Sequence, residues 1–130
     1  MKVQRTVLIA VVGLLLAAAS ALAHHSFSAE YDATKQITVK GKFTKMEWVN
    51  PHSWVHLDVA GSDGKVVSWG CETPPPNNLY RQGWRKDALK VGEEIEVRGY
   101  AAKDGSPTMW AQVVTVVATE QRVFNGPAPQ

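Results

Sequence analysis

Hydrophobic and polar residues alternate along five segments of the chain, which is the pattern of half-buried β-strands. Two Asp-Gly turns, at residues 63–64 and 104–105, join neighbouring segments as hairpins. Near Met46 to Val49 the alternation slips, as it does at a bulge or bend. The pattern therefore predicts an all-β domain over residues 36–118, with strands at residues 37–49, 53–60, 66–71, 94–101 and 108–117.

A proline-rich segment separates the third predicted strand from the fourth. Asn77 follows three prolines and is placed to cap a short helix over residues 78–82, which Gly83 would end. Three strands, a short helix and two more strands is the order of the OB-fold, a small five-stranded Greek-key barrel. The long, bent first strand fits this fold because it must serve both sides of the barrel. An open sandwich or an SH3-like barrel would give similar patterns.

The two ends of the chain have different compositions from the domain. Lys2 and Arg5 precede the apolar run from Val7 to Ala19, which is shorter than the roughly 18 residues that span a bilayer. The triplet at residues 21–23, Ala-Leu-Ala, matches the pattern read by signal peptidase. We expect residues 1–23 to be a cleaved signal peptide and the protein to be periplasmic or secreted, without a membrane span after cleavage; a retained anchor is the alternative. Residues 24–35 read as an N-terminal arm, and residues 119–130 as a flexible tail.

Removal of the signal peptide changes the charge balance. Without Lys2 and Arg5 the chain keeps twelve basic and twelve acidic side chains, so its formal net charge is zero. Nucleic-acid-binding domains usually carry a basic surface, so this balance does not favour a nucleic-acid partner. Cys71 is the single cysteine, and we expect a small buried residue in a strand. Pairing between chains or binding of a soft metal is the alternative for this thiol.

His52 and His56 have the spacing that places two imidazoles on one face of a helix. The segment around them alternates as a strand does, so the two side chains would point the same way about 13 Å apart. Zinc–imidazole bonds are about 2 Å long, so the two rings would not share an ion unless the strand were broken.

Trp48 and Trp54 flank the turn at residues 50–53, Asn-Pro-His-Ser, and could frame a pocket there. One face of the second and third strands commonly binds ligands in small barrels. We therefore take as candidate ligand-binding residues Trp48, Asn50, His52, Trp54 and His56. The alternative is that His52, Trp54 and His56 simply form the solvent side of a half-buried strand.

Cleavage after Ala23 would make His24 the first residue of the exported protein. Its α-amino group and imidazole could chelate one metal ion, and His25 or His52 could add a further nitrogen ligand. Copper(II) prefers such tetragonal nitrogen ligation, in the arrangement called a histidine brace. The alternative is a disordered polar arm with no ligand.

No catalytic motif names a reaction. The chain lacks a phosphate-binding glycine loop and a nucleophile elbow, and Glu47 and Glu72 are expected to be solvated. Two hypotheses remain, together with a bare protein-binding surface. The first is a non-enzymatic binding or accessory module for a small ligand, metal or envelope partner. The second is a copper-dependent redox protein that uses His24.

The segment AHHSFSAEYDATKQITVKGKFTKMEWVNPHSWVHLDV, followed by GW and by LKVGEEIEVRGYAAKDGSP, resembles a family of uncharacterised bacterial exported proteins. Members of that family typically begin, after processing, at His-His-Ser and carry an Asn-Pro-His-Ser-Trp or Asn-Pro-His-Ala-Trp segment. The resemblance covers nearly all of the chain after residue 23. It implies a secreted or periplasmic small β-barrel and assigns no catalytic residue. Cys71 departs from the small or apolar residue expected at its position.

Overall fold

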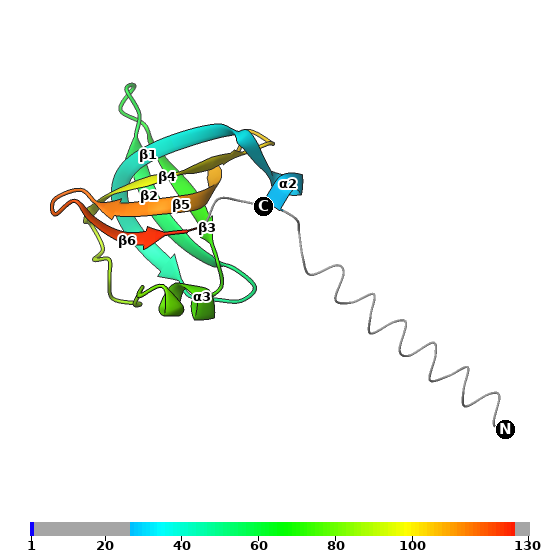
Figure 1. Cartoon of the computed structure of the whole chain (residues 1–130). Helices are drawn as coiled ribbons and strands as arrows, with labels where there is room; N and C mark the ends of the chain where they lie inside the picture. The colour runs from blue at the N-terminus through cyan, green and yellow to red at the C-terminus, as the bar shows by residue number, and fades with distance from the viewer. Residues whose placement is uncertain (2–26, 127–130) are drawn as a thin grey trace.

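The computed structural model describes Met1 and residues 27–126, and its elements are almost entirely β-strands. The all-β prediction is therefore confirmed. Figure 1 shows the strands curving around a common core, with the one-turn helix α2 beside the turn between β4 and β5. The elements in chain order are α2 (Phe27–Glu30), β1 (Tyr31–Glu47), β2 (Ser53–Ala60), β3 (Val66–Thr73), α3 (Pro76–Arg81), β4 (Glu94–Ala102), β5 (Thr108–Val116) and β6 (Gln121–Asn125).

The sheet has the strand order β3-β2-β1-β4-β5-β6, and neighbours in this order are antiparallel. A further, parallel pairing joins β3 to β5 from Gly70–Thr108 to Glu72–Trp110, so five strands form a closed ring. The sixth strand, β6, pairs with β5 outside that ring. This strand lies in the segment that the sequence predicted to be a tail. The sequence does not reveal it because only Phe124 of its five residues is buried, which is too little for a recognisable alternation.

β1 begins at Tyr31, six residues before the predicted start, and its burial pattern becomes regular only near Val39. Gly41 lies where the backbone of β2 leaves no room for a side chain, since a Cβ there would lie 2.2 Å from the carbonyl oxygen of Asp58. The register with β2 shifts between Phe43 and Lys45, slightly before the expected position of the slip. The glycine and the bulge together let one long strand pair with both β2 and β4.

The short helix lies between β3 and β4 as predicted, but it begins at Pro76 rather than at residue 78. Pro75 is its N-cap and makes no side-chain cap bond, so the capping role predicted for Asn77 is wrong. Proline suits the first helical turn because its fixed φ is close to helical and its missing N–H has no partner there. Leu79 is fully buried and holds this helix on the barrel.

The core is formed by the inward-facing residues of the strands. β2 alternates buried and half-buried positions, with Val55 and Leu57 fully enclosed. Cys71 is also enclosed, as expected, and burial raises the pKa of its thiol. Within residues 27–126 no helix is long and apolar enough to cross a membrane.

Candidate functional site

Two adjoining recesses share Trp54 of β2 as a lining residue. The first, here called the His52 recess, has a volume of about 250 Å³. The second, the Lys103 recess, has a volume of about 360 Å³ and lies toward α2 and the β4–β5 turn. Trp54 and Glu30 line both, so the indole is a wall common to the two. The lining of the His52 recess is Glu30, Glu47, Val49, Asn50, Pro51, His52, Trp54 and Glu72.

His52 is held by a buried carboxylate at the bottom of its recess. Nδ1 of His52 is hydrogen-bonded to Oε1 of Glu72, and the hydroxyl of Tyr31 donates to Oε2 of the same carboxylate. Glu72 is 7% exposed and His52 30% exposed, so the carboxylate is enclosed while the imidazole reaches the recess. A carboxylate oxygen accepts hydrogen bonds, so we assign Nδ1 of His52 as the donor, and Nε2 is the ring nitrogen that does not contact Glu72. Burial and the bond to Glu72 raise the pKa of Tyr31, which stays a phenol.

The register of the β2–β3 hairpin places Glu72 in this site. Ala60 pairs with Val66 across the turn. Moving away from the turn, down in number along β2 and up along β3, brings Trp54 opposite Glu72. The outward face of β2 therefore continues onto β3 at Glu72, beside His52. The expectation that Glu72 is solvated was wrong because the β3–β5 pairing encloses this end of β3, where Glu72 pairs with Trp110.

Aromatic rings extend the site toward the N-terminal segment. The His52 ring lies edge-on to Trp110, with centroids 5.5 Å apart. Phe27 of α2 also packs edge-on against Trp110, at 5.9 Å, and stacks on Tyr31. Lys103 anchors the same helix, since its backbone N–H donates to the carbonyl of Glu30 and its Nζ donates to the carbonyl of Ser28. Residues 27–30, predicted as part of an arm, are thus docked beside the site.

Trp54 is supported from behind by His56 and Gly70. The rings of Trp54 and His56 are stacked with centroids 6.5 Å apart, and a Cβ on Gly70 would lie 3.6 Å from the indole. Nε2 of His56 has no hydrogen-bond partner among the described residues, and it lies 3.5 Å from Oε1 of Glu47. Burial lowers the pKa of His56, although the Glu47 carboxylate opposes the shift. Lys45, at 2.5 Å, holds the pKa of Glu47 below its usual value.

The structure brings together three of the five candidate ligand-binding residues. Asn50, His52 and Trp54 line one recess, and the peptide bond that follows Asn50 is cis. His56 is a supporting residue behind Trp54. Trp48 lies elsewhere, packed against the core and edge-on to Trp84 at 6.5 Å.

The candidate metal ligands His24 and His25 lie outside the described residues. Within residues 27–126 no group of three or more His, Cys, Asp or Glu side chains is placed to hold a metal ion. His52 itself has the arrangement common among metal-binding histidines, in which the ring nitrogen away from the metal donates to a carboxylate.

Charge distinguishes the two recesses. Three carboxylates, those of Glu30, Glu47 and Glu72, line the His52 recess, and no lysine or arginine does. The Lys103 recess has the carboxylates of Glu30 and Asp104 and the ammonium group of Lys103. A ligand in the His52 recess would therefore meet an indole and three carboxylates, of which Glu47 also pairs with Lys45 and Glu72 with His52.

Comparisons with known proteins give a family and a distant likeness. The model of DUF6152, described as a family of unknown function, matches residues 11–111. No curated protein matches the chain. Among solved structures, apo TiaS, described as a tRNAIle2 agmatidine synthetase, is 20% identical over 63% of this chain, with a TM-score of 0.44. A ZRD-deleted TiaS mutant in complex with agmatine is 20% identical over 73% of this chain, with a TM-score of 0.46. The matched regions span 18% and 23% of those two chains.

Proposed function

The chain belongs to DUF6152, a family of unknown function, and we propose that it is an exported, non-enzymatic binding module that holds a small, positively charged ligand in the His52 recess. The observation that carries this proposal is the lining of that recess. Three carboxylates from α2, β1 and β3 surround a half-buried indole and an imidazole fixed by a buried glutamate. The predicted signal peptide supports export to the periplasm or beyond the cell.

The strand pairings support the finer assignment of the barrel as an OB-fold. The ring runs β1-β2-β3-β5-β4 and back to β1, and its closing contact is the parallel pair β3–β5. OB-folds bind ligands on the face of strands 2 and 3, between the loop joining strands 1 and 2 and the loop joining strands 4 and 5. The two recesses occupy the corresponding place, because His52 lies in the first of these loops and Asp104 in the second.

The chemistry of the lining favours a cation over a neutral or anionic ligand. An organic cation on the face of a tryptophan gains about 0.5–1 kcal/mol at an exposed site and more where water is excluded. The neighbouring carboxylates would add Coulomb attraction. Nε2 of His52 and the amide of Asn50 offer hydrogen-bonding groups that would orient such a ligand.

Choline and its neutral isostere 3,3-dimethyl-1-butanol test the proposal, because they share shape and differ in charge. We expect choline to shift the Trp54 indole N–H signal in a saturable NMR titration, and the neutral isostere to bind about two- to fivefold more weakly or worse. Trp54→Ala should abolish the saturable shifts at His52. Tyr80→Ala, which removes an exposed ring on α3, should leave binding unchanged.

The carboxylates are tested by a second matched pair. Glu47→Gln should weaken choline binding, whereas Glu94→Gln should not, because Glu94 also pairs with a lysine but lines neither recess. No saturable shift with either probe would contradict binding in the recess. Equal affinity for choline and the alcohol would leave a binding recess but refute the preference for positive charge.

A second candidate function is copper binding through the mature N-terminus, with redox chemistry as its outcome. Two observations favour it. Glu72 leaves Nε2 of His52 free for a metal, and Phe27 packs on the ring that contacts His52. The ring centroids of Phe27 and His52 are thus at most about 11 Å apart, and three extended residues span about 10 Å. Chain length therefore permits His24 or His25 to join His52 in one coordination sphere.

The copper hypothesis is tested with protein whose first residue, His24, is verified by intact mass. Copper(II) titration followed by spin resonance should show a nitrogen-rich tetragonal site. His52→Ala should alter its spectrum, and one extra residue before His24 should weaken binding strongly. Equal binding by the extended and the mature chains would refute a site that uses the α-amino group.

A further inference from the structure

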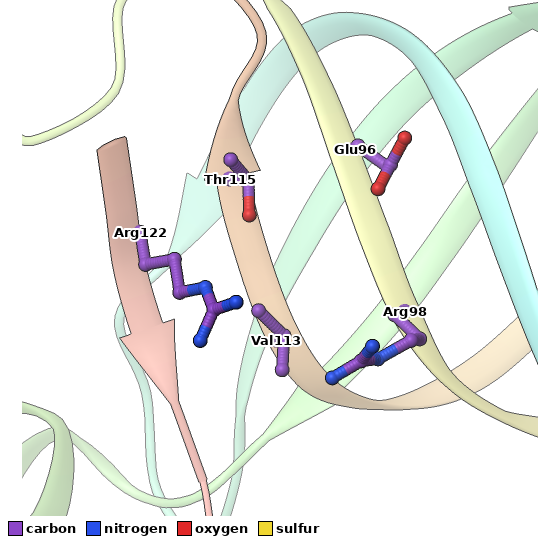
Figure 2. A pocket seen from close by; sticks show the side chains of 5 residues that line it. All are labelled: Glu96, Arg98, Val113, Thr115 and Arg122. Atoms are coloured by element: carbon purple, nitrogen blue, oxygen red, sulfur yellow. The ribbon is translucent and has the colours of Figure 1, made fainter. Parts of the chain in front are cut away.

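A third, smaller hollow lies on the outer face of β4, β5 and β6, and its lining contains two arginines. Its volume is about 80 Å³, and it is lined by Glu96 and Arg98 of β4, Val113 and Thr115 of β5, and Arg122 of β6. Figure 2 shows the guanidinium groups of Arg98 and Arg122 on opposite sides of Val113, with Glu96 farther along β4. The hollow shares no lining residue with the His52 or Lys103 recess.

Strand register explains why the two arginines face one another. Arg98 pairs with Val113, and Arg122 pairs with Thr115, so both arginines flank the middle strand β5. Bulges next to both contacts, between Arg98 and Gly99 and between Val114 and Thr115, bend the sheet at this point. Val113 is only 6% exposed although it is not part of the core cluster. Its shielding fits the apolar stems of the arginines lying over it, as long cationic side chains often do.

The charges in this hollow are not balanced from within the described chain. The ion pairs formed among residues 27–126 are Lys40–Glu94, Lys45–Glu47, His52–Glu72 and His56–Glu47, and neither arginine belongs to one. Glu96 lines the hollow but lies beyond ion-pair distance of both guanidinium groups. Two guanidinium groups thus flank one small space with a single carboxylate at its edge.

We propose that this hollow binds a tetrahedral oxyanion, a phosphate or sulfate group, between Arg98 and Arg122. A guanidinium presents N–H donors in a fixed fork that matches two oxygens of such a group. Two forks from opposite sides would supply four donors and two positive charges, and the Thr115 hydroxyl stands beside them as a further donor. The small volume accommodates one such group and not a larger ligand within the hollow itself.

Binding there would also link β6 to the closed ring. Among the described strands β6 pairs with β5 alone, and Phe124 adds a core contact to Trp84. An anion held by Arg98 and Arg122 would join β4 to β6 across β5. A ligand that binds only the folded state stabilises it by mass action, so phosphate should raise the melting temperature.

The test is an NMR titration of the full exported chain with inorganic phosphate at constant ionic strength, with chloride exchanged for phosphate. We expect saturable shifts of the Arg98 and Arg122 side-chain Nε–H signals. Arg98→Gln and Arg122→Gln should each weaken binding about tenfold, because each removes a charged hydrogen-bonding partner. Lys65→Gln makes the same charge change in the β2–β3 turn and should leave the affinity unchanged.

Vesicles distinguish a free oxyanion from a lipid headgroup. Binding to phosphatidylglycerol vesicles that inorganic phosphate displaces would support a headgroup as the source of the phosphate group. Saturable phosphate binding without vesicle binding would support a small soluble ligand. Linear, non-saturating shifts, or equal weakening by Lys65→Gln and the arginine variants, would overturn the proposal in favour of unspecific screening.

Discussion

The hydroxyl of Tyr31 provides the most informative single perturbation of the candidate site. It donates to the buried carboxylate of Glu72, and the Tyr31 side chain is 3% exposed. Tyr31→Phe removes this donor and keeps the ring that packs against Phe27 and Trp110. Glu72 would then keep His52 as its only side-chain partner among the described residues, in a place that water reaches poorly.

A hydrogen bond to a charged group contributes about 1.5–3 kcal/mol, so Tyr31→Phe should lower the free energy of unfolding by about 2 kcal/mol. For a domain of this size that corresponds to a fall in melting temperature of roughly 8–16 °C. Urea denaturation followed by tryptophan fluorescence measures the change, and an unaltered m-value would show that the denatured state is unaffected.

Tyr100→Phe is the matched control. Tyr100 also packs against Phe27, but its hydroxyl makes no hydrogen bond to the described residues, so the loss should stay within about 0.5 kcal/mol. A loss below about 0.5 kcal/mol for Tyr31→Phe, or equal losses for the two variants, would refute the structural role assigned to the Tyr31–Glu72 bond.

Three further predictions concern His56, Gly99 and Cys71. Because burial lowers the pKa of His56, His56 is protonated in the unfolded chain before it is protonated in the folded chain as the pH falls below about 6.5, so the free energy of unfolding decreases from there down to the folded pKa. His56→Gln should flatten this dependence of the free energy on pH, measured by urea unfolding at stepped pH, and an unchanged dependence would contradict the prediction. A Cβ at Gly99 would lie 1.9 Å from the carbonyl oxygen of Trp110, so Gly99→Ala should lower the free energy of unfolding by more than about 3 kcal/mol. Gly105→Ala, at a positive φ, should lower it by about 1–2 kcal/mol, and thermal melts that rank the two variants in reverse would contradict the prediction. Buried Cys71, whose thiol pKa is raised, should react with a thiol reagent only in denaturant, and rapid labelling of the native protein would contradict its burial.

The periodic parts of the fold could be predicted from the sequence. The alternation at Val55 and Leu57 and the Asp-Gly turns indicate strands and hairpins through local chemistry alone. β6 escaped prediction because its only buried residue, Phe124, owes its burial to contacts with distant residues such as Trp84. The start of β1 at Tyr31 was missed for a similar reason, since its pairing with Ala102 crosses the whole domain.

The candidate site could be predicted only in part. Asn50, His52 and Trp54 follow from the turn and the strand that succeeds it. Glu72 could have been found by carrying the hairpin register back from the Ala60–Val66 pair, which places it opposite Trp54. Tyr31 and Trp110 could not, because they reach the site through the β1–β4 and β3–β5 pairings, and no local pattern specifies those.

The proposed ligand binding in the His52 recess includes one arrangement that can be tested directly: Glu72 holds Nδ1 of His52, which leaves Nε2 for the ligand. The most direct measurement is a long-range ¹H–¹⁵N NMR spectrum of the histidine side chains of the full exported chain near neutral pH. We expect His52 to carry its proton on Nδ1, and Glu72→Gln to weaken that preference. A His52 ring protonated on Nε2 alone would contradict the arrangement, and with it the presentation of Nε2 to a ligand.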